Sequence, residues 1–206
     1  MKLSSKELST LREKVRLSLS EKRFLHTLGV EKAARKIAEF CLPDMKDEIS
    51  VAALLHDIAK EYDTEALLRF IDEDGILLSD VDRLTAAALH SYAAPCVIKK
   101  YFPEYATKEI LNACRNHTLG SADMSLFEEI IFIADYIEDG RSYDSCINVR
   151  DKLYSSFEIG NTALNIKNLH KAVVSSIDYT LSNLKMKNKF INPKILLTRN
   201  AFLNKK

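Results

Sequence analysis

The scarcity of turn-forming residues constrains this chain more than any other feature of its sequence. Only 5 Gly and 4 Pro occur among 206 residues, whereas a many-stranded sheet needs such residues at regular intervals between its strands. The chain is 47% hydrophobic and 29% charged, which is the balance of a globular protein and excludes the disordered and fibrous classes. We therefore expect an all-α fold.

Capping signals and hydrophobic spacing divide the chain into helices. Ser4 with Glu7, and Ser125 with Glu128, have the spacing of capping boxes. Further expected caps are Ser20, Thr64, Thr107 and Asn161. After the first helix we expect helices over residues 21–41, 49–59, 65–72, 79–90, 108–117, 126–139, 147–159 and 162–185, with a short one between Pro95 and Pro103.

The chain shows no internal repeat and no Gly/Ser/Pro linker, so a single domain is the simplest interpretation. We expect a helical extension over residues 1–19, the main domain over 20–185, and a basic segment over 186–206. This last segment either packs on the domain or trails from it as a partly frayed end.

Charge and cysteine spacing exclude several classes of protein. A net charge of +1 is too small to bind nucleic acid by general phosphate neutralisation. The four cysteines lack CxxC spacing, which is untypical of a thiolate zinc site or a redox motif and favours buried thiols in a reducing cytoplasm. The N-terminus lacks a signal peptide's apolar core, and the uncharged run near residues 84–98 is too short to span a membrane. We expect a cytoplasmic protein.

Histidines and two carboxylates carry the chemical signal. Any single member of His26, His56, His90, His117 and His170 can be explained as a hydrogen-bonded core imidazole. Asp57 and Asp135, however, lie in strongly apolar segments, where a buried carboxylate is costly unless it is paired or bound to a cation.

Together these residues predict a metal site inside a helical bundle. Nitrogen and carboxylate donors suit Fe, Mn, Co, Zn or Ni. Six donors are too many for one catalytic ion that must also hold water and substrate, but they fit two ions that share a carboxylate, so we expect a dinuclear centre.

Five segments then resemble a known family. They are RFLHTLGV (23–30), AALLHDIAK (52–60), LH (89–90), RNHTLG (115–120) and MSLFEEIIFIADYIEDGR (124–141). Their order is similar to that of the HD-domain superfamily of metal-dependent phosphohydrolases and, more narrowly, of its YqeK-type branch, the symmetrical bis(5'-nucleosyl)-tetraphosphatases. The resemblance covers the chain from about Ser20 to near its C-terminus. It implies that a metal-bound hydroxide cleaves diadenosine tetraphosphate, and related dinucleoside polyphosphates, into two ADP.

The resemblance also implies roles for particular residues. One ion would be held by His26, His56, Asp57 and Asp135, and the other by Asp57, His90 and His117. Iron is the metal that the branch implies, and Mn or Co also suit these donors. Asp57 and Lys60 are the expected catalytic residues. The expected substrate-binding residues are Arg23, Lys60, Thr118, Gly120 and Arg141, although an ion pair, a turn or a solvated surface position would explain each of them equally well.

The chain also departs from the pattern of this branch. Residues 91–95 replace a segment that commonly contains glycine, Leu119 and residues 121–123 replace a Thr and an Arg-Pro segment, and Asp139 replaces a proline. None of these changes falls on an expected ligand, so they bear on nucleotide preference more than on hydrolysis.

Three alternatives to the tetraphosphatase are kept. They are an HD-domain hydrolase of another nucleoside phosphate or phosphodiester, a non-catalytic nucleotide-binding protein stabilised by metal, and a di-iron oxygenase. Monomer and homodimer are both left open.

Overall fold

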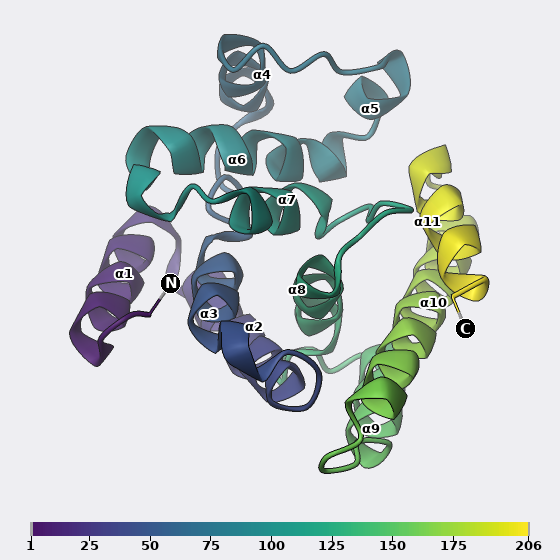
Figure 1. The fold of residues 1–206 in the computed structure, drawn as a ribbon. Helices are drawn as coiled ribbons and strands as arrows, with labels where there is room; N and C mark the ends of the chain where they lie inside the picture. The colour runs from purple at the N-terminus through teal and green to yellow at the C-terminus, as the bar shows by residue number, and fades with distance from the viewer. Residues whose placement is uncertain (1, 206) are drawn as a thin grey trace.

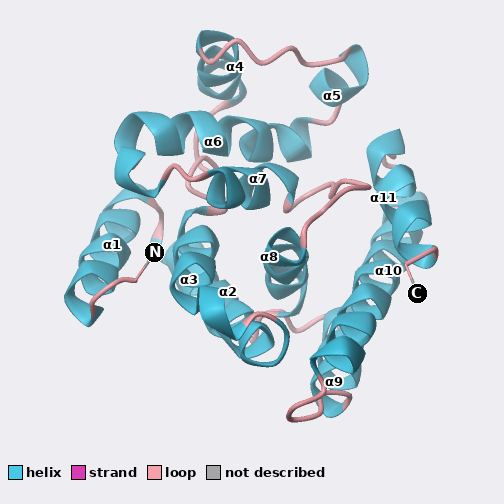
Figure 2. Ribbon diagram, viewed as in Figure 1, coloured by secondary structure: helices cyan, strands magenta, loops and turns pink. Residues whose placement is uncertain are grey.

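The computed structural model describes residues 2–205 (Figure 1). All of the elements it describes are helices joined by loops and turns (Figure 2), so the all-α expectation is confirmed. The α-helices are α1 (Ser5–Ser18), α2 (Glu21–Cys41), α3 (Lys46–Leu55), α4 (Thr64–Glu73), α5 (Asp80–Leu84), α6 (Leu89–Tyr101), α7 (Lys108–Asn116), α8 (Leu126–Ile137), α9 (Asp144–Ser155), α10 (Thr162–Met186) and α11 (Pro193–Leu203). Three short 3-10 helices accompany them: η1 (Pro43–Met45), η2 (Ala86–Ala88) and η3 (Pro103–Tyr105).

Helix α8 is the centre of the bundle (Figure 1). It packs against α2 and α3 on one side, against α10 on another, and against α7. Its residues Ile130, Ile131 and Ile133 have no solvent-exposed surface. Removing such side chains from water is the dominant favourable term in folding, and α8 therefore forms the core around which the other helices are arranged.

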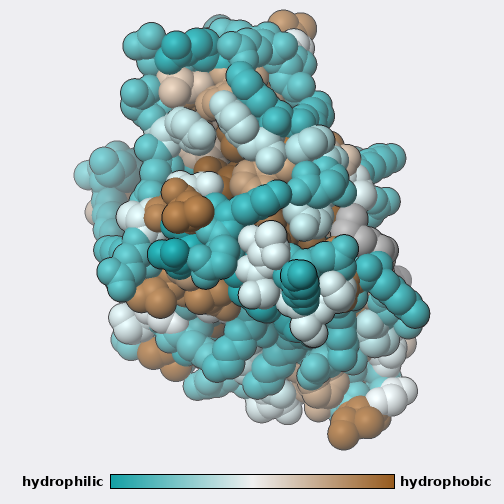
Figure 3. Space-filling view, turned by 90° about the vertical axis from the view of Figure 1, so that its left-hand side faces the viewer, coloured by the Kyte–Doolittle hydropathy of each residue, from teal (hydrophilic) through white to brown (hydrophobic). Residues whose placement is uncertain are grey.

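Peripheral helices cover this core. α1 packs against α3, α4 packs against α6, and α11 packs against α10. The face that Figure 3 shows is mainly hydrophilic, and its hydrophobic residues lie in small separate groups. Within residues 2–205, no helix has both the length and the apolar character needed to cross a membrane.

Most of the expected caps are present. Both capping boxes form, and Thr107 and Asn161 accept hydrogen bonds from the first turns of α7 and α10. The cap expected at Thr64 is wrong, because the Asp63 carboxylate accepts the hydrogen bond from Ala66 N instead. Ser20 occupies the N-cap position of α2, but its hydroxyl bonds to the Glu61 carboxylate.

Four expected helix boundaries differ from the structure. The helix over 49–59 ends at Leu55, the helix over 147–159 spans 144–155, and the helix over 79–90 is divided into α5, η2 and the start of α6. Pro95 lies inside α6 and not at its boundary. Proline removes one backbone donor, yet α6 continues past it, packed between α4 and α7.

The cysteines and the C-terminal segment complete the fold. All four cysteines are free and buried, as expected. Residues 193–203 form an ordered helix in place of the frayed end considered above. Thr198 of this helix is fully buried and donates to Leu119 O at 3.1 Å, which fastens α11 to the loop after α7.

Candidate metal centre

Five segments that are distant in the sequence bring the six expected ligand residues into one cluster. His26 comes from α2, His90 from the first turn of α6, and Asp135 from α8. His56 and Asp57 follow the end of α3, and His117 follows the end of α7. All of these except His26 and Asp135 are buried, and those two are largely covered.

Asp57 lies at the middle of the cluster. Its Oδ1 is 3.2 Å from His90 Nε2 and 3.3 Å from His117 Nε2. Its Oδ2 is 3.6 Å from His56 Nε2 and 3.9 Å from His26 Nε2. Each oxygen of one carboxylate therefore faces a different pair of imidazoles, which is the arrangement that a carboxylate shared by two cations requires.

Backbone carbonyls orient two of the imidazoles. His56 Nδ1 donates to Ala53 O at 2.6 Å, and His117 Nδ1 donates to Cys114 O at 2.8 Å. Because a carbonyl oxygen can only accept, Nδ1 carries the proton in both rings, and the lone pair of each ring lies on Nε2, which faces Asp57. Such hydrogen bonds commonly fix the tautomer of a metal-binding histidine.

The same hydrogen bonding explains why α3 ends at Leu55. In a continued α-helix the Ala53 carbonyl would accept from residue 57, but here it accepts from the His56 ring. The chain continues with tighter bonds, from Ile58 N to Leu55 O and from Lys60 N to Asp57 O. The turn allows His56 and Asp57 to face the same centre, although side chains of adjacent residues in a helix point about 100° apart.

The donor set fits metal ions. Three overlapping groups of ligand atoms lie within 4.8 Å of one another: His26, His56 and Asp57; His56, His117 and Asp135; and Asp57, His90 and His117. His56 Nε2, His26 Nε2 and Asp57 Oδ1 are buried without a well-formed hydrogen bond. Buried polar atoms are nearly always hydrogen-bonded, so these three atoms, directed at one point, are suited to binding a cation.

Burial and mutual charge control protonation in the cluster. Burial alone would raise the pKa of Asp57, but the adjacent histidines lower it well below its usual range. Burial lowers the pKa of His56 and of His90 to about 4 in each case. A neutral imidazole and an ionised carboxylate are the forms that bind metal, so both residue types are ready to ligate at neutral pH.

Three cations and a hydroxyl surround the ligands. Arg23 Nη1 is 2.8 Å from Asp57 Oδ2, and Arg141 Nη2 is 2.7 Å from Asp135 Oδ1. Lys60 Nζ is 3.1 Å from His90 Nε2, and Thr118 Oγ1 is 3.3 Å from the same atom.

Gly120 is the one expected site residue that has a separate structural explanation. Its φ is +69°, a left-handed conformation that favours glycine, and a Cβ there would lie 2.5 Å from Thr198 Cγ2.

Glu138 is a residue of the site that sequence reasoning missed. Its buried carboxylate lies with Oε1 3.2 Å from His26 Nδ1 and accepts from Gly140 N at Oε2, at 2.6 Å. The contact with Nδ1 leaves His26 Nε2 available to a metal. A Cβ on Gly29 would lie 2.4 Å from Glu138 Oε2, so glycine is required there. The segments 23–30 and 124–141 contained this signal, but only folding brings residues 26 and 138 together.

Comparison with known proteins places this cluster in a family. The HD-domain family model matches residues 23–140, a range that contains all six clustered ligand residues. The chain belongs to the HD-domain family. Helices α9, α10 and α11 lie beyond the region that the family model matches.

Full-length relatives extend the similarity to these helices. A protein of Halalkalibacterium halodurans named symmetrical bis(5'-nucleosyl)-tetraphosphatase is 34% identical over 193 residues, covering 92% of this chain and 93% of its own. A Bacillus subtilis protein of the same name is 31% identical, covering 90% of this chain and 92% of its own. The crystal structure of a predicted HD superfamily hydrolase from Clostridium acetobutylicum, described as involved in NAD metabolism, has a TM-score of 0.83 and 29% identity, covering 96% of this chain and 97% of its own.

Proposed function

We propose that this HD-domain protein is a symmetrical bis(5'-nucleosyl)-tetraphosphatase that hydrolyses diadenosine tetraphosphate into two ADP. The observation that carries the proposal is the position of Asp57, whose two oxygens face two separate pairs of histidines. The names and near-complete coverage of the curated relatives support the same activity. The alternatives are hydrolysis of another nucleotide and nucleotide binding without catalysis.

The donor atoms support two ions. His26, His56, Asp57 and Asp135 would hold one, and Asp57, His90 and His117 the other, so that Asp57 is shared. The donors are nitrogen and oxygen, which suits iron and also manganese or cobalt. Two bound ions make a hydroxide available at neutral pH and polarise a phosphoryl oxygen.

The reaction that we propose adds one water to one substrate molecule. The water oxygen bonds to an inner phosphorus, the bond from that phosphorus to the central bridging oxygen breaks, and the bridging oxygen leaves on the second ADP. Negative charge grows on that oxygen as the bond breaks. A cation close to it therefore lowers the barrier.

The protein supplies three cations for this charge. Arg23 and Arg141 each pair with a carboxylate that would bind an ion. Once the ions neutralise those carboxylates, both guanidinium groups can bind phosphate oxygens, whose geometry they match. Lys60 lies at the imidazole of His90 and is placed to donate a hydrogen bond to the departing oxygen.

Product analysis tests the proposal. Wild-type protein loaded with iron, manganese or cobalt should convert one diadenosine tetraphosphate into two ADP, and Asp57→Ala should lose both turnover and metal. AMP plus ATP as products, or full activity in a folded Asp57→Ala protein, would contradict it. Hydrolysis confined to other nucleotides, or ADP binding with no turnover of any nucleotide, would favour the alternatives.

A further inference from the structure

Two cavities reach the metal centre and share Arg141 and Tyr143 in their linings. The first, which we call the α2 cavity, has a volume of about 870 Å³ and lies along the start of α2 and the loop at residues 138–143. It includes the ligand residue His26. A substrate with two nucleoside ends and a phosphate chain between them can therefore enter the centre through one cavity and leave it through the other.

The second, which we call the α10 cavity, has a volume of about 590 Å³ and lies between α8, α10 and residues 141–146. It includes the ligand residues His117 and Asp135. Cavities of this size commonly enclose small ligands, so a nucleoside fits within it.

The α10 cavity has the chemistry of a nucleoside site. Four aromatic rings line it, those of Phe132, Tyr136, Tyr143 and Tyr179. Tyr179 is 39% exposed, so its ring is open to a ligand. Asn183 also lines it, and no hydrogen bond is recorded for its side-chain amide within residues 2–205. A base stacks on aromatic rings, and an Asn amide can form two hydrogen bonds with adenine.

The α2 cavity has a different chemistry. Four basic side chains line it, those of Lys22, Arg23, Lys32 and Arg141. Apart from the imidazole of His26, its aromatic lining is Tyr143 alone among the described residues. Such a cavity suits phosphate groups more than a base.

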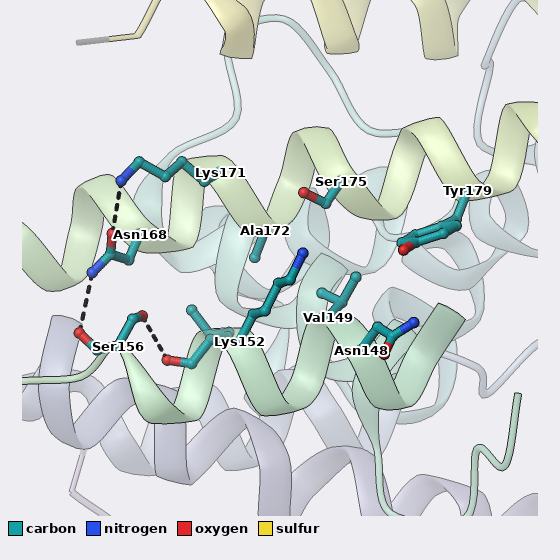
Figure 4. A pocket seen from close by; sticks show the side chains of 10 residues that line it. Asn148, Val149, Lys152, Ser156, Asn168, Lys171, Ala172, Ser175 and Tyr179 are labelled. Atoms are coloured by element: carbon teal, nitrogen blue, oxygen red, sulfur yellow. Dashed lines mark hydrogen bonds between the residues drawn. The ribbon is translucent and has the colours of Figure 1, made fainter. Parts of the chain in front are cut away.

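A third hollow, of about 370 Å³ between α9 and α10, contains none of the six ligand residues (Figure 4). There Lys171 donates to Asn168, and Asn168 donates to Ser156 O. Asn148 also lines this hollow and is exposed. It provides a matched control for Asn183, because it is an exposed asparagine on an adjacent helix.

We propose that the symmetrical substrate is recognised asymmetrically. One nucleoside binds in the α10 cavity, against Tyr179 and the Asn183 amide. The phosphates of the other half run past Arg141 into the α2 cavity, and the second nucleoside makes few contacts. This inference rests on the proposed function, but ADP binding can test it separately.

The first test measures ADP binding to the metal-loaded protein. Asn183→Ala should weaken binding about 5-fold or more, the size of effect expected for a bidentate asparagine–adenine pair. Asn148→Ala should bind ADP as the wild type does. Equal affinity of Asn183→Ala and wild type would overturn the inference, whether or not the protein hydrolyses the tetraphosphate.

The second test removes one nucleoside from the substrate. Adenosine 5'-tetraphosphate, which symmetrical cleavage converts to ADP and pyrophosphate, should retain kcat/KM within about 10-fold of diadenosine tetraphosphate, or about 1.4 kcal/mol. A loss greater than about 100-fold would show that both nucleosides are recognised and would overturn the inference. If neither compound is cleaved, the proposed function fails, and the ADP titration still decides the asymmetry.

Discussion

Replacing Gly29 with alanine should weaken metal binding more than it weakens the fold. The new Cβ would lie 2.4 Å from Glu138 Oε2 and 3.2 Å from its Cδ. The Glu138 carboxylate must therefore move, and it loses its contacts with His26 Nδ1 and Gly140 N. His26 then has no partner that holds its Nε2 toward the centre.

The magnitudes follow from these contacts. Each hydrogen bond to a charged group contributes about 1.5–3 kcal/mol to stability, whereas replacing glycine by alanine inside a helix gains about 1 kcal/mol. We expect the metal-free variant to lose about 1–3 kcal/mol of unfolding free energy. Losing a hydrogen-bond partner of a metal ligand typically weakens metal affinity by about 10–100-fold, and we expect that loss here.

The assay combines urea unfolding of the metal-free protein with a metal-competition titration. Gly160→Ala is the control, because Gly160 has φ +78° and no atom within 4 Å of its Cβ position. It should cost about 1–2 kcal/mol through backbone strain alone and leave metal affinity unchanged. If Gly29→Ala binds metal as tightly as Gly160→Ala does, then Glu138 does not orient His26 and our reasoning is refuted.

Three further predictions concern other residues. Lys60→Met should keep its metal and lower kcat about 100-fold, and an unchanged kcat would exclude Lys60 from the reaction. Burial raises the pKa of Glu129 from 4.5 to about 7, against the opposing charge of Lys205, so the folded protein holds a proton that the unfolded chain releases, and stability falls as pH rises from about 4.5 to 7. Urea unfolding of metal-free Glu129→Gln should lack this step, which is at most about 3 kcal/mol, and parallel pH profiles would contradict the assignment. Gly120→Ala should lose about 2–4 kcal/mol through strain and overpacking, and Thr198→Ser should restore part of that loss by removing Cγ2. Failure of the second substitution to restore stability would count against the packing explanation for Gly120.

Local signals in the sequence predicted much of the fold. The two capping boxes and the caps at Thr107 and Asn161 depend on residues three positions apart, and such patterns are visible in the sequence itself. The ligand residues could be named because buried carboxylates in apolar segments are rare and need a partner.

Other features depend on contacts that only the fold creates. α3 ends at Leu55 because the His56 ring takes the Ala53 carbonyl, and no helix-ending residue marks that position. α6 continues through Pro95 while packed between two other helices, against the local preference of proline. Glu138 and His26 are 112 residues apart, so their contact has no local signature in the sequence.

The metal content of the purified protein tests the central claim most directly. We expect two ions per chain after loading with iron or manganese, measured by elemental analysis on protein that is shown to be folded. In Asp57→Ala both ions should be lost or strongly weakened, because the shared carboxylate is gone. A wild-type protein that binds a single ion at saturation, or an Asp57→Ala protein that still binds two, would contradict the account.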